Sequence, residues 1–192
     1  MTLKQLSFDF VSRPAKHTPE AILTAALGVF HAQGVGVSMA DVASAANVSN
    51  GTLFNYFATK QELIDELYIW VKSDLAEAIS AIDEELSIHE QMRLIWDLWL
   101  EWASSQREAH AVMNLLHQSG LASEAARVKG SELIGGPMQV LGTAYATGLL
   151  VDLPLDYLVS LIEHHFDQAV ASELNQRERD IAFQVLWNGI TN

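Results

Sequence analysis

Helix-start signatures recur along the chain and restrict it to an all-α fold. Each places Ser, Thr or Asn three residues ahead of an acidic residue, so that side chains can cap the free N–H groups of a first helical turn. They begin at Ser38, Thr59, Ser87, Ser105 and Asn175, each followed by apolar residues at helical spacing. Thr18-Pro19-Glu20 and Pro154 mark two further helix starts. Strand-like alternation is limited to Leu6, Phe8 and Phe10, so the sequence predicts an all-α protein.

Residues 18–60 predict three short helices and the start of a fourth. Gly34 and Gly36 end the first, and Asn47 tolerates the left-handed backbone that a tight turn after the second requires. Ser49 can cap the third, in which Leu53, Phe54 and Phe57 are expected to face inward. The fourth begins at Thr59, and its apolar stripe runs as far as Leu86. Two short helices joined by a tight turn fit a helix-turn-helix, whose second helix can enter the major groove of DNA, and by spacing alone they fit capped helices of an all-α core equally well.

Charge is distributed unevenly along the chain. The whole protein carries −13, whereas residues 1–60 hold four basic and three acidic side chains. Because an acidic surface repels DNA, the nearly neutral N-terminal region is the only expected nucleic-acid surface. Arg13, Lys16 and His17 lie on an N-terminal arm that could reach phosphate or the minor groove.

The third helix offers hydrogen-bonding side chains on its expected outer face. Asn can pair with adenine through two hydrogen bonds, and the methyl group of Thr can pack on that of thymine. Backbone N–H groups at helix starts such as Ser38 and Ser49 suit phosphate, and Lys60 adds a full positive charge at a third start. The candidate DNA-binding residues are Ser38, Ser49, Asn50, Thr52, Asn55, Tyr56 and Lys60.

The segment from about Thr18 to Val71 resembles the DNA-binding domain of the tetracycline-repressor (TetR) family of bacterial transcription regulators. The resemblance rests on Ala25-Ala26, Phe30, Gly34, Val42-Ala43, Asn47-Val48-Ser49, Gly51-Thr52-Leu53, Tyr56-Phe57, Thr59-Lys60 and Glu62-Leu63. Phe54 stands where the family usually has Tyr, and Tyr56 where it often has His. Asn47 replaces the usual turn Gly.

The resemblance implies roles for particular residues. Lys60 and Ser38 would hold phosphate, and Thr52, Asn55 and Asn50 would face the bases. It also implies a homodimer formed by the last two long helices, and a ligand pocket between the fourth helix and those that follow it.

The acidic remainder of the chain offers candidate effector-binding residues. Trp96, Trp99 and Trp102 fan over part of one helix. Together with other large side chains they could line an aromatic cavity for an unknown apolar or aromatic small molecule, although such a stripe also fits a plain core. The other candidates are Met113, His117, Tyr145 and Phe166.

Two apolar stripes near the end of the chain support a homodimer through residues of about 154–190. One runs from Leu155 to Val170 and the other from Phe183 to Ile190, which is sufficient for a four-helix interface across a two-fold axis. The alternative is that both stripes pack inside one subunit.

Other chemistry finds little support in the sequence. There is no Cys, and His110 and His117 lie two helical turns apart, too far to share a metal. Because hydrolase, metalloprotease and Walker A motifs are missing, we expect no enzyme and no cofactor. The run from Ile134 to Val151 fits a buried helix better than a membrane span, and the start of the chain lacks a signal peptide, which favours the cytoplasm.

The sequence therefore predicts an N-terminal arm (1–17), a helix-turn-helix domain (18–71), and a helical effector-binding and dimerisation domain (72–192). The predicted function is a ligand-responsive transcriptional repressor that binds a palindromic operator in double-stranded DNA as a homodimer. A small molecule would release it. The alternative is a helical small-molecule-binding or adaptor protein without sequence-specific DNA binding.

Overall fold

The computed structural model describes residues 18–192, which form ten α-helices and one short 3₁₀ helix. In chain order they are α1 (Pro19–Gln33), η1 (Gly34–Gly36), α2 (Met39–Ala45), α3 (Asn50–Tyr56), α4 (Lys60–Ala78), α5 (Ile88–Ser105), α6 (Arg107–Gln118), α7 (Glu124–Leu133), α8 (Gly135–Ala146), α9 (Leu155–Ala171) and α10 (Gln176–Ile190). Extended pairing in this part of the chain is limited to one isolated bridge between Leu150 and Thr191. The all-α prediction is confirmed, while the arm at 1–17 lies outside the described residues.

Short-range capping fixes where most of these helices begin. The predicted caps are confirmed at Thr18, Ser38, Ser49, Thr59, Ser87 and Asn175, where each side chain accepts a hydrogen bond from the N–H three residues later. Each cap stabilises its helix by about 1 kcal/mol. At the start of α4 the box is modified, because Glu62 accepts from the N–H of Ala58 rather than from that of Thr59.

Two predicted helix boundaries are wrong. Ser105 does not cap a helix: α5 continues to that residue, its hydroxyl donates to the carbonyl of Trp102 at 3.0 Å, and Gln106 separates α5 from α6. Helix α4 ends at Ala78 instead of running to Leu86. Ile82 lies in the following loop and packs against the core from there, so its spacing imitated a helical stripe.

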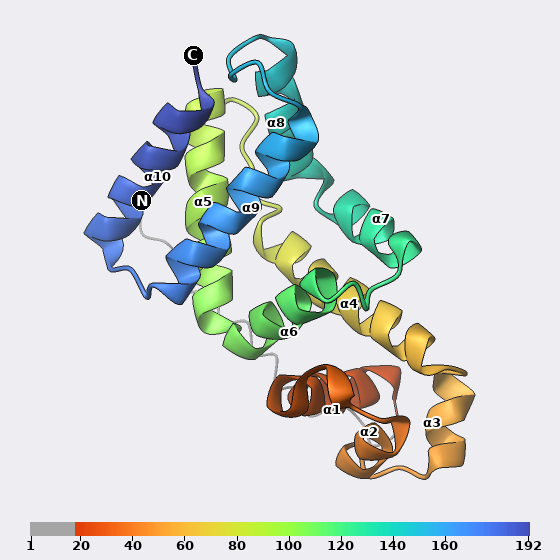
Figure 1. Cartoon of the computed structure of the whole chain (residues 1–192). Coiled ribbons are helices and arrows are strands. Elements are labelled where there is room, and N and C mark those ends of the chain that lie inside the picture. The colour runs from red at the N-terminus through yellow and green to blue at the C-terminus, as the bar shows by residue number, and fades with distance from the viewer. Residues whose placement is uncertain (1–17) are drawn as a thin grey trace.

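The helices form a small head and a larger body joined by α4 (Figure 1). Helices α1, α2 and α3 make the head, and α4 runs from it into the body alongside α7. In the body, α5 contacts α8 and α9, and α9 contacts α10. Helix α1 also contacts α6, so the head meets the body through two helices.

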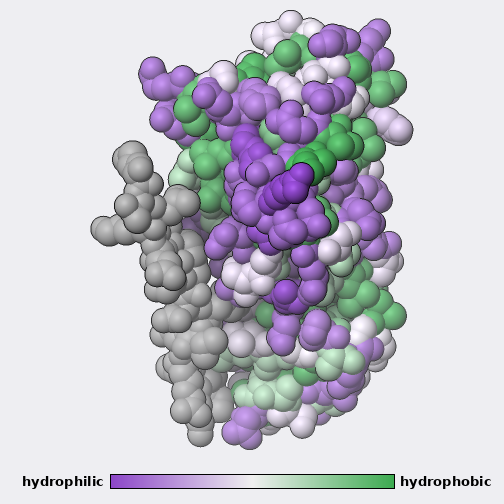
Figure 2. Space-filling model, turned by 90° about the vertical axis from the view of Figure 1, so that its left-hand side faces the viewer, coloured by the Kyte–Doolittle hydropathy of each residue, from purple (hydrophilic) through white to green (hydrophobic). Residues whose placement is uncertain are grey.

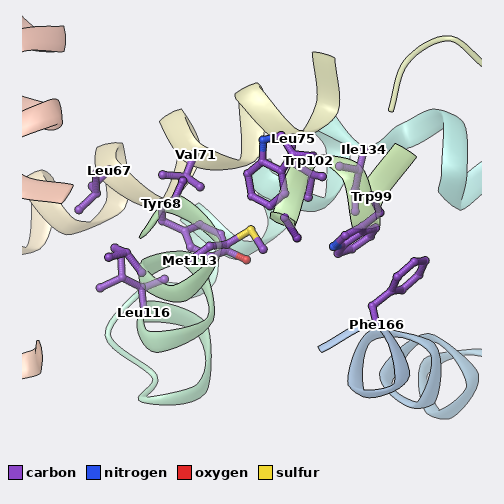
Figure 3. Close-up of a cluster of buried hydrophobic side chains, with 14 of the residues drawn as sticks. Leu67, Tyr68, Val71, Leu75, Trp99, Trp102, Met113, Leu116, Ile134 and Phe166 are labelled. Atoms are coloured by element: carbon purple, nitrogen blue, oxygen red, sulfur yellow. The ribbon is translucent and has the colours of Figure 1, made fainter. Parts of the chain in front are cut away.

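Large side chains from α4, α5, α6 and α9 form the centre of the body (Figure 3). Tyr68 and Val71 of α4 face Met113 of α6, and Trp99 of α5 faces Phe166 of α9. The rings of Trp99 and Phe166 are stacked, with centroids 4.5 Å apart and an interplanar angle of 13°. This cluster is continuous with the buried residues of the head.

Gly130 allows α7 to pass unusually close to α4. A Cβ atom there would lie 2.9 Å from Cε1 of Tyr68 and 3.2 Å from Cγ of Lys72. Since real Cβ atoms do not approach other atoms this closely, the absence of a side chain at Gly130 is required by the packing.

Hydrogen bonds tie the first two turns of α4 to the segment between α6 and α7. The side-chain amide of Gln61 donates to the carbonyl of Leu121 at 2.8 Å. The N–H of Ser123 donates to Oδ1 of Asp65 at 2.9 Å, and the same oxygen accepts from Gln61. These hydrogen bonds connect α4 directly to this segment.

The two apolar stripes considered for a dimer interface lie inside the subunit, as the alternative interpretation has it. The buried members are Leu158, Ile162, Phe166, Ala169, Phe183, Leu186 and Ile190. Other faces of the same helices carry exposed apolar residues: Tyr157 and Leu161 on α9, and Ile181 and Val185 on α10. Hydrophobic residues also interrupt the mainly hydrophilic surface on the side of the molecule that carries α10 (Figure 2).

None of the helices in the described part of the chain has the length and hydrophobicity required to span a bilayer.

Candidate nucleic-acid interface

Helices α2 and α3 form a helix-turn-helix with a tight turn between them. Asn47 adopts the left-handed conformation, with φ of 55°, as predicted from its position after α2. The N–H of Val48 donates to the carbonyl of Ala43 at 3.0 Å and closes the end of α2. Ser49 then starts α3 by accepting the N–H of Thr52 at 3.0 Å.

Helix α3 is anchored by one face and leaves the other in solvent. Leu53 and Phe57 are buried, whereas Asn50 and Asn55 are exposed, as predicted. Phe54 was expected to face inward, and this is wrong: its side chain is 47% exposed. Leu53 and Phe57 are four residues apart and share one face, so their neighbour Phe54 points about 100° away from Leu53. Sequence reasoning thus missed an aromatic residue on the outer face.

The hydroxyl groups at the start of α3 are already engaged with each other. The Oγ atom of Ser49 lies 2.9 Å from Oγ1 of Thr52. The Thr52 side chain is half-buried, and Tyr56 at the other end of α3 is 40% exposed. The outer face of α3 therefore combines two amides with the two aromatic rings of Phe54 and Tyr56.

Ser38 is engaged in a complete capping box at the start of α2. Its hydroxyl donates to Oδ2 of Asp41 at 2.6 Å, and its N–H donates to the same oxygen at 2.8 Å. Hydrogen bonds from the side chain and backbone of Ser38 lower the pKa of Asp41. A negative charge thus stands beside this helix start.

Lys60 provides a positive charge at the start of α4. Its side chain is half-buried, and Nζ lies 3.5 Å from the carbonyl oxygen of Val35, at the limit of a hydrogen bond. The ammonium group is thereby held near the head without a carboxylate partner among residues 18–192. Arg13, Lys16 and His17 lie outside the described residues.

Gly51 is not required by the packing of the head. A Cβ atom there would meet one neighbour, Oγ of Ser49, at the ordinary distance of 3.8 Å. Its backbone does not adopt a positive φ. A side chain would therefore fit in the folded protein, and the small surface at Gly51 serves no evident structural purpose.

The body contains a cavity of about 80 Å³ between α4, α5, α6 and α9. Most of its lining residues are charged or polar, which differs from the aromatic lining predicted from the sequence. The lining residues are Tyr68, Lys72, Trp99, Met113, Asn114, His117, Gln118, Ser160, Glu163, His164 and Asp167.

The structure brings three of the predicted effector-binding residues together at this cavity: Trp99, Met113 and His117. Trp96 and Phe166 pack in the core, with ring centroids 4.8 Å apart, and Trp102 donates to Asp74 at 2.6 Å. Tyr145 is exposed on α8 and does not line the cavity. Most of the polar lining residues belong to α6 and α9. Except for His117, the sequence did not predict them, because the apolar residues of these helices determine the direction of the buried face.

Tyr68 and Lys72 form the α4 wall of the cavity. Burial, reinforced by the negative charge of Glu163, raises the pKa of Tyr68 to about 12. Its hydroxyl lies 3.3 Å from Nδ1 of His117. Burial lowers the pKa of Lys72, and the charges of Glu163 and Asp167 oppose this effect.

Histidines do not gather into a metal site in residues 18–192, where no cluster of three or more potential His, Asp or Glu ligands occurs. The adjacent His164 and His165 contact different backbone carbonyls, those of Ser160 and Ala182.

Comparisons with known proteins agree with this arrangement. Residues 22–67 match the sequence profile of the bacterial regulatory proteins of the tetR family. The chain is similar to the HTH-type transcriptional regulator LuxR of Vibrio harveyi, with 30% identity over 105 residues. That alignment covers 46% of this chain and 51% of the relative, so it spans about half of the relative's length.

The similarity to solved structures extends over nearly the whole chain. A TetR-family transcription regulator from Shewanella sp. PV-4 has a TM-score of 0.83 and 26% identity, covering 91% of this chain and 98% of its own. One from Marinobacter aquaeolei VT8 shares the fold, with a TM-score of 0.78 and 16% identity over 91% of this chain and 95% of its own.

Helix α3 is exposed, follows α2 after a tight turn and is joined through α4 to a helical body. This arrangement defines a helix-turn-helix protein with a companion domain. The matched head and the shared whole-chain fold make the relationship specific. Residues 22–67 thus match the DNA-binding region of the tetR family, and the chain as a whole has the fold of solved TetR-family transcription regulators.

Proposed function

We propose that the protein is a dimeric, ligand-responsive transcriptional regulator that represses by binding a palindromic operator in the bacterial cytoplasm. The observation that carries the proposal is the outer face of α3. It projects two amides and two aromatic rings into solvent while Leu53 and Phe57 hold the helix in place. Amides can hydrogen-bond to base edges, and exposed aromatic rings mark a surface for contact with a partner, so this face suits the major groove.

Base recognition falls to the exposed residues of α3. Asn50 and Asn55 form no hydrogen bonds with other side chains among residues 18–192, so their amides are available to adenine edges. The Thr52 hydroxyl is engaged with Ser49, which leaves its methyl group for a thymine methyl. Phe54 adds an apolar surface for the same purpose.

Phosphate recognition relies on helix starts more than on full charges. Lys60 supplies one ammonium group, and the starts of α2, α3 and α4 supply backbone N–H groups. Ser38 would contribute through its place at such a start, since Asp41 occupies its hydroxyl. With so few charges, we expect a shallow salt dependence that reflects about two to four phosphates per half-site.

Dimerisation would use the outward faces of α9 and α10. Tyr157 and Leu161 are four residues apart, as are Ile181 and Val185, so each helix presents an apolar pair on one face. Two copies of this surface form a four-helix interface across a two-fold axis, within the region 154–190. A two-fold dimer presents two α3 helices and so matches a palindromic site.

The proposed division at residue 71 falls inside α4, which is one uninterrupted helix from Lys60 to Ala78. A ligand that displaces α6 or α4 in the body would thus change the spacing of the two heads. Binding of the operator weakens when both heads no longer fit the two half-sites at once.

Selection of genomic fragments by the purified protein tests the proposal. We expect enrichment of a palindromic site and loss of its binding in Asn55→Ala, with Gln139→Ala on α8 as an exposed amide control. The recovered site should be titrated at several salt concentrations. If no sequence is enriched even at low salt, the alternative of a small-molecule-binding or adaptor protein without operator recognition replaces the proposal.

Gly51→Ala should separate DNA binding from stability. Because a Cβ atom fits in the fold, the variant should be as stable as the parent, or more stable by about 0.5–1 kcal/mol. On DNA, the added methyl group would hold α3 away from the groove and lower operator affinity about tenfold or more. Thermal unfolding and operator titration measure the two effects.

The matched control is Gly142→Ala on α8, another helical glycine with space for a Cβ atom. It should show the same stability and unchanged operator affinity. Wild-type affinity in Gly51→Ala would mean that the start of α3 does not approach DNA closely.

A further inference from the structure

Lys72 is a buried ammonium group with no hydrogen-bonding partner. Its side chain is 7% exposed, yet Nζ donates no hydrogen bond and has no carboxylate within 4 Å among residues 18–192. Its contacts are the faces of two aromatic rings, with Nζ 5.9 Å from the centroid of Tyr68 and 6.0 Å from that of Trp99. Burying an ammonium group without an anion is unfavourable, which points to a function in binding.

Two carboxylates on α9 share the cavity with Lys72, and they differ in their partners. Asp167 accepts a hydrogen bond from Nδ2 of Asn114 at 2.7 Å and lies 3.2 Å from Nε2 of His110. Burial raises the pKa of Asp167, but the hydrogen bonds from His110 and Asn114 outweigh it, so the net shift is downward. Glu163 has no hydrogen bond or ion pair with any residue from 18 to 192, so its carboxylate is open to a ligand.

This pairing of charges selects a ligand that carries both signs. A simple anion would meet Lys72 but also face Glu163 and Asp167, and a simple cation would meet these carboxylates but also face Lys72. A ligand with an anionic and a cationic end can satisfy both walls.

The cavity also limits the size of the ligand. Its volume of about 80 Å³ is several times the roughly 10–15 Å³ that one water needs, and about half of an engineered cavity of roughly 150 Å³ that binds benzene. A ligand of only a few heavy atoms fits this space.

We propose that the cavity binds a small α-amino acid as a zwitterion, with its carboxylate on Lys72 and its ammonium group on Glu163. The conclusion that this amino acid is the effector that controls DNA binding rests on the proposed function. The binding itself can be measured without DNA, so a failure of operator recognition would leave the binding test unaffected.

Three probes of nearly equal size test separately the carboxylate and the ammonium group of the ligand. L-Alanine carries both, alaninamide lacks the carboxylate, and propionate lacks the ammonium group. Isothermal titration with the full-length protein, supported by the fluorescence of Trp99 in the cavity wall, should show alanine binding about tenfold or more tighter than either analogue. Equal binding of alanine and propionate would overturn the zwitterion, as would the absence of alanine binding at millimolar concentration.

Variants assign each end of the ligand. Lys72→Met keeps the length of the side chain and removes its charge, and should lower alanine affinity about tenfold or more while raising Tm. Glu163→Gln should abolish the preference for alanine over propionate. The exposed pair Lys129→Met and Glu132→Gln on α7 provides matched controls. Unchanged alanine affinity in both cavity variants, with circular dichroism showing that they are folded, would overturn the site.

Discussion

Val185→Glu is expected to convert the protein from a dimer to a monomer and to lower its affinity for the operator about a hundredfold or more. Val185 is 62% exposed in the single subunit, so the glutamate leaves the subunit's own packing intact. In a two-fold interface each substitution occurs twice, and two carboxylates would be buried among apolar side chains. Each monomer then binds a single half-site, and the additional affinity that a dimer gains when both heads bind at once is lost.

Sedimentation and operator titration measure the two effects of Val185→Glu. Val128→Glu is the matched control, because Val128 is a 50% exposed valine on α7, away from α9 and α10. The control should remain dimeric with full operator affinity. A Val185→Glu protein that stays dimeric would exclude this face of α10 from the interface, and Ile181→Glu would then be expected to have no effect either.

Phe166→Ala should lower the free energy of unfolding by about 3–5 kcal/mol. The phenyl ring of Phe166 is 2% exposed, stacks on Trp99 and lies 4.8 Å, between centroids, from Trp96. Removing it leaves a void between α5 and α9 that rigid helices can fill only in part. For a chain of this size, Tm should fall by about 6–20 °C.

Chemical denaturation and calorimetry measure the loss, and Tyr145→Ala gives the comparison. Tyr145 was grouped with Phe166 from the sequence, but it is 37% exposed on α8. Its removal should change the free energy of unfolding by less than about 1 kcal/mol. Similar losses in both variants would contradict the assignment of Phe166 to the core and Tyr145 to the surface.

Helix starts could be predicted because capping is a local interaction. Ser38 and Asp41, or Ser87 and Glu90, are three residues apart and meet in any helix that begins there. Ser105 shows the limit of this argument. The same spacing to Glu108 spans the junction of two helices: Ser105 is the last residue of α5, which contains the buried Trp102 and Ala103, and Glu108 lies in the first turn of α6.

The direction of an apolar face could be predicted, but its partner could not. Leu158 and Ile162 form a stripe on α9 that any hydrophobic neighbour could cover, and the covering helices belong to the same subunit. The dimer surface proposed instead consists of a few exposed residues between polar ones. In α3, Phe54 was assigned inward by its hydrophobicity alone, although Leu53 and Phe57 already occupied the buried face.

The cavity was beyond prediction because its charges come from distant segments. Lys72 follows Val71 in α4, and Glu163 follows Ile162 in α9, so in the sequence each resembles an ordinary solvated residue beside an apolar stripe. The packing of α4 against α5 and α6, with α9 lining the same cavity, places Lys72 on an inner wall, and α7 packs closely over the stem of Lys72 at Gly130.

Under the proposed function, the hydrogen bonds from α4 to Leu121 and Ser123 would give the operator itself a regulatory role. They connect the DNA-binding head to the end of α6, the helix that contributes His117 and Gln118 to the cavity. Coupling between two sites is reciprocal, so a ligand that weakens DNA binding by some factor is itself bound more weakly by the same factor on DNA. The chromosome would thus act as a competing effector. Cells with more operator copies would need more ligand to reach the same occupancy of the cavity.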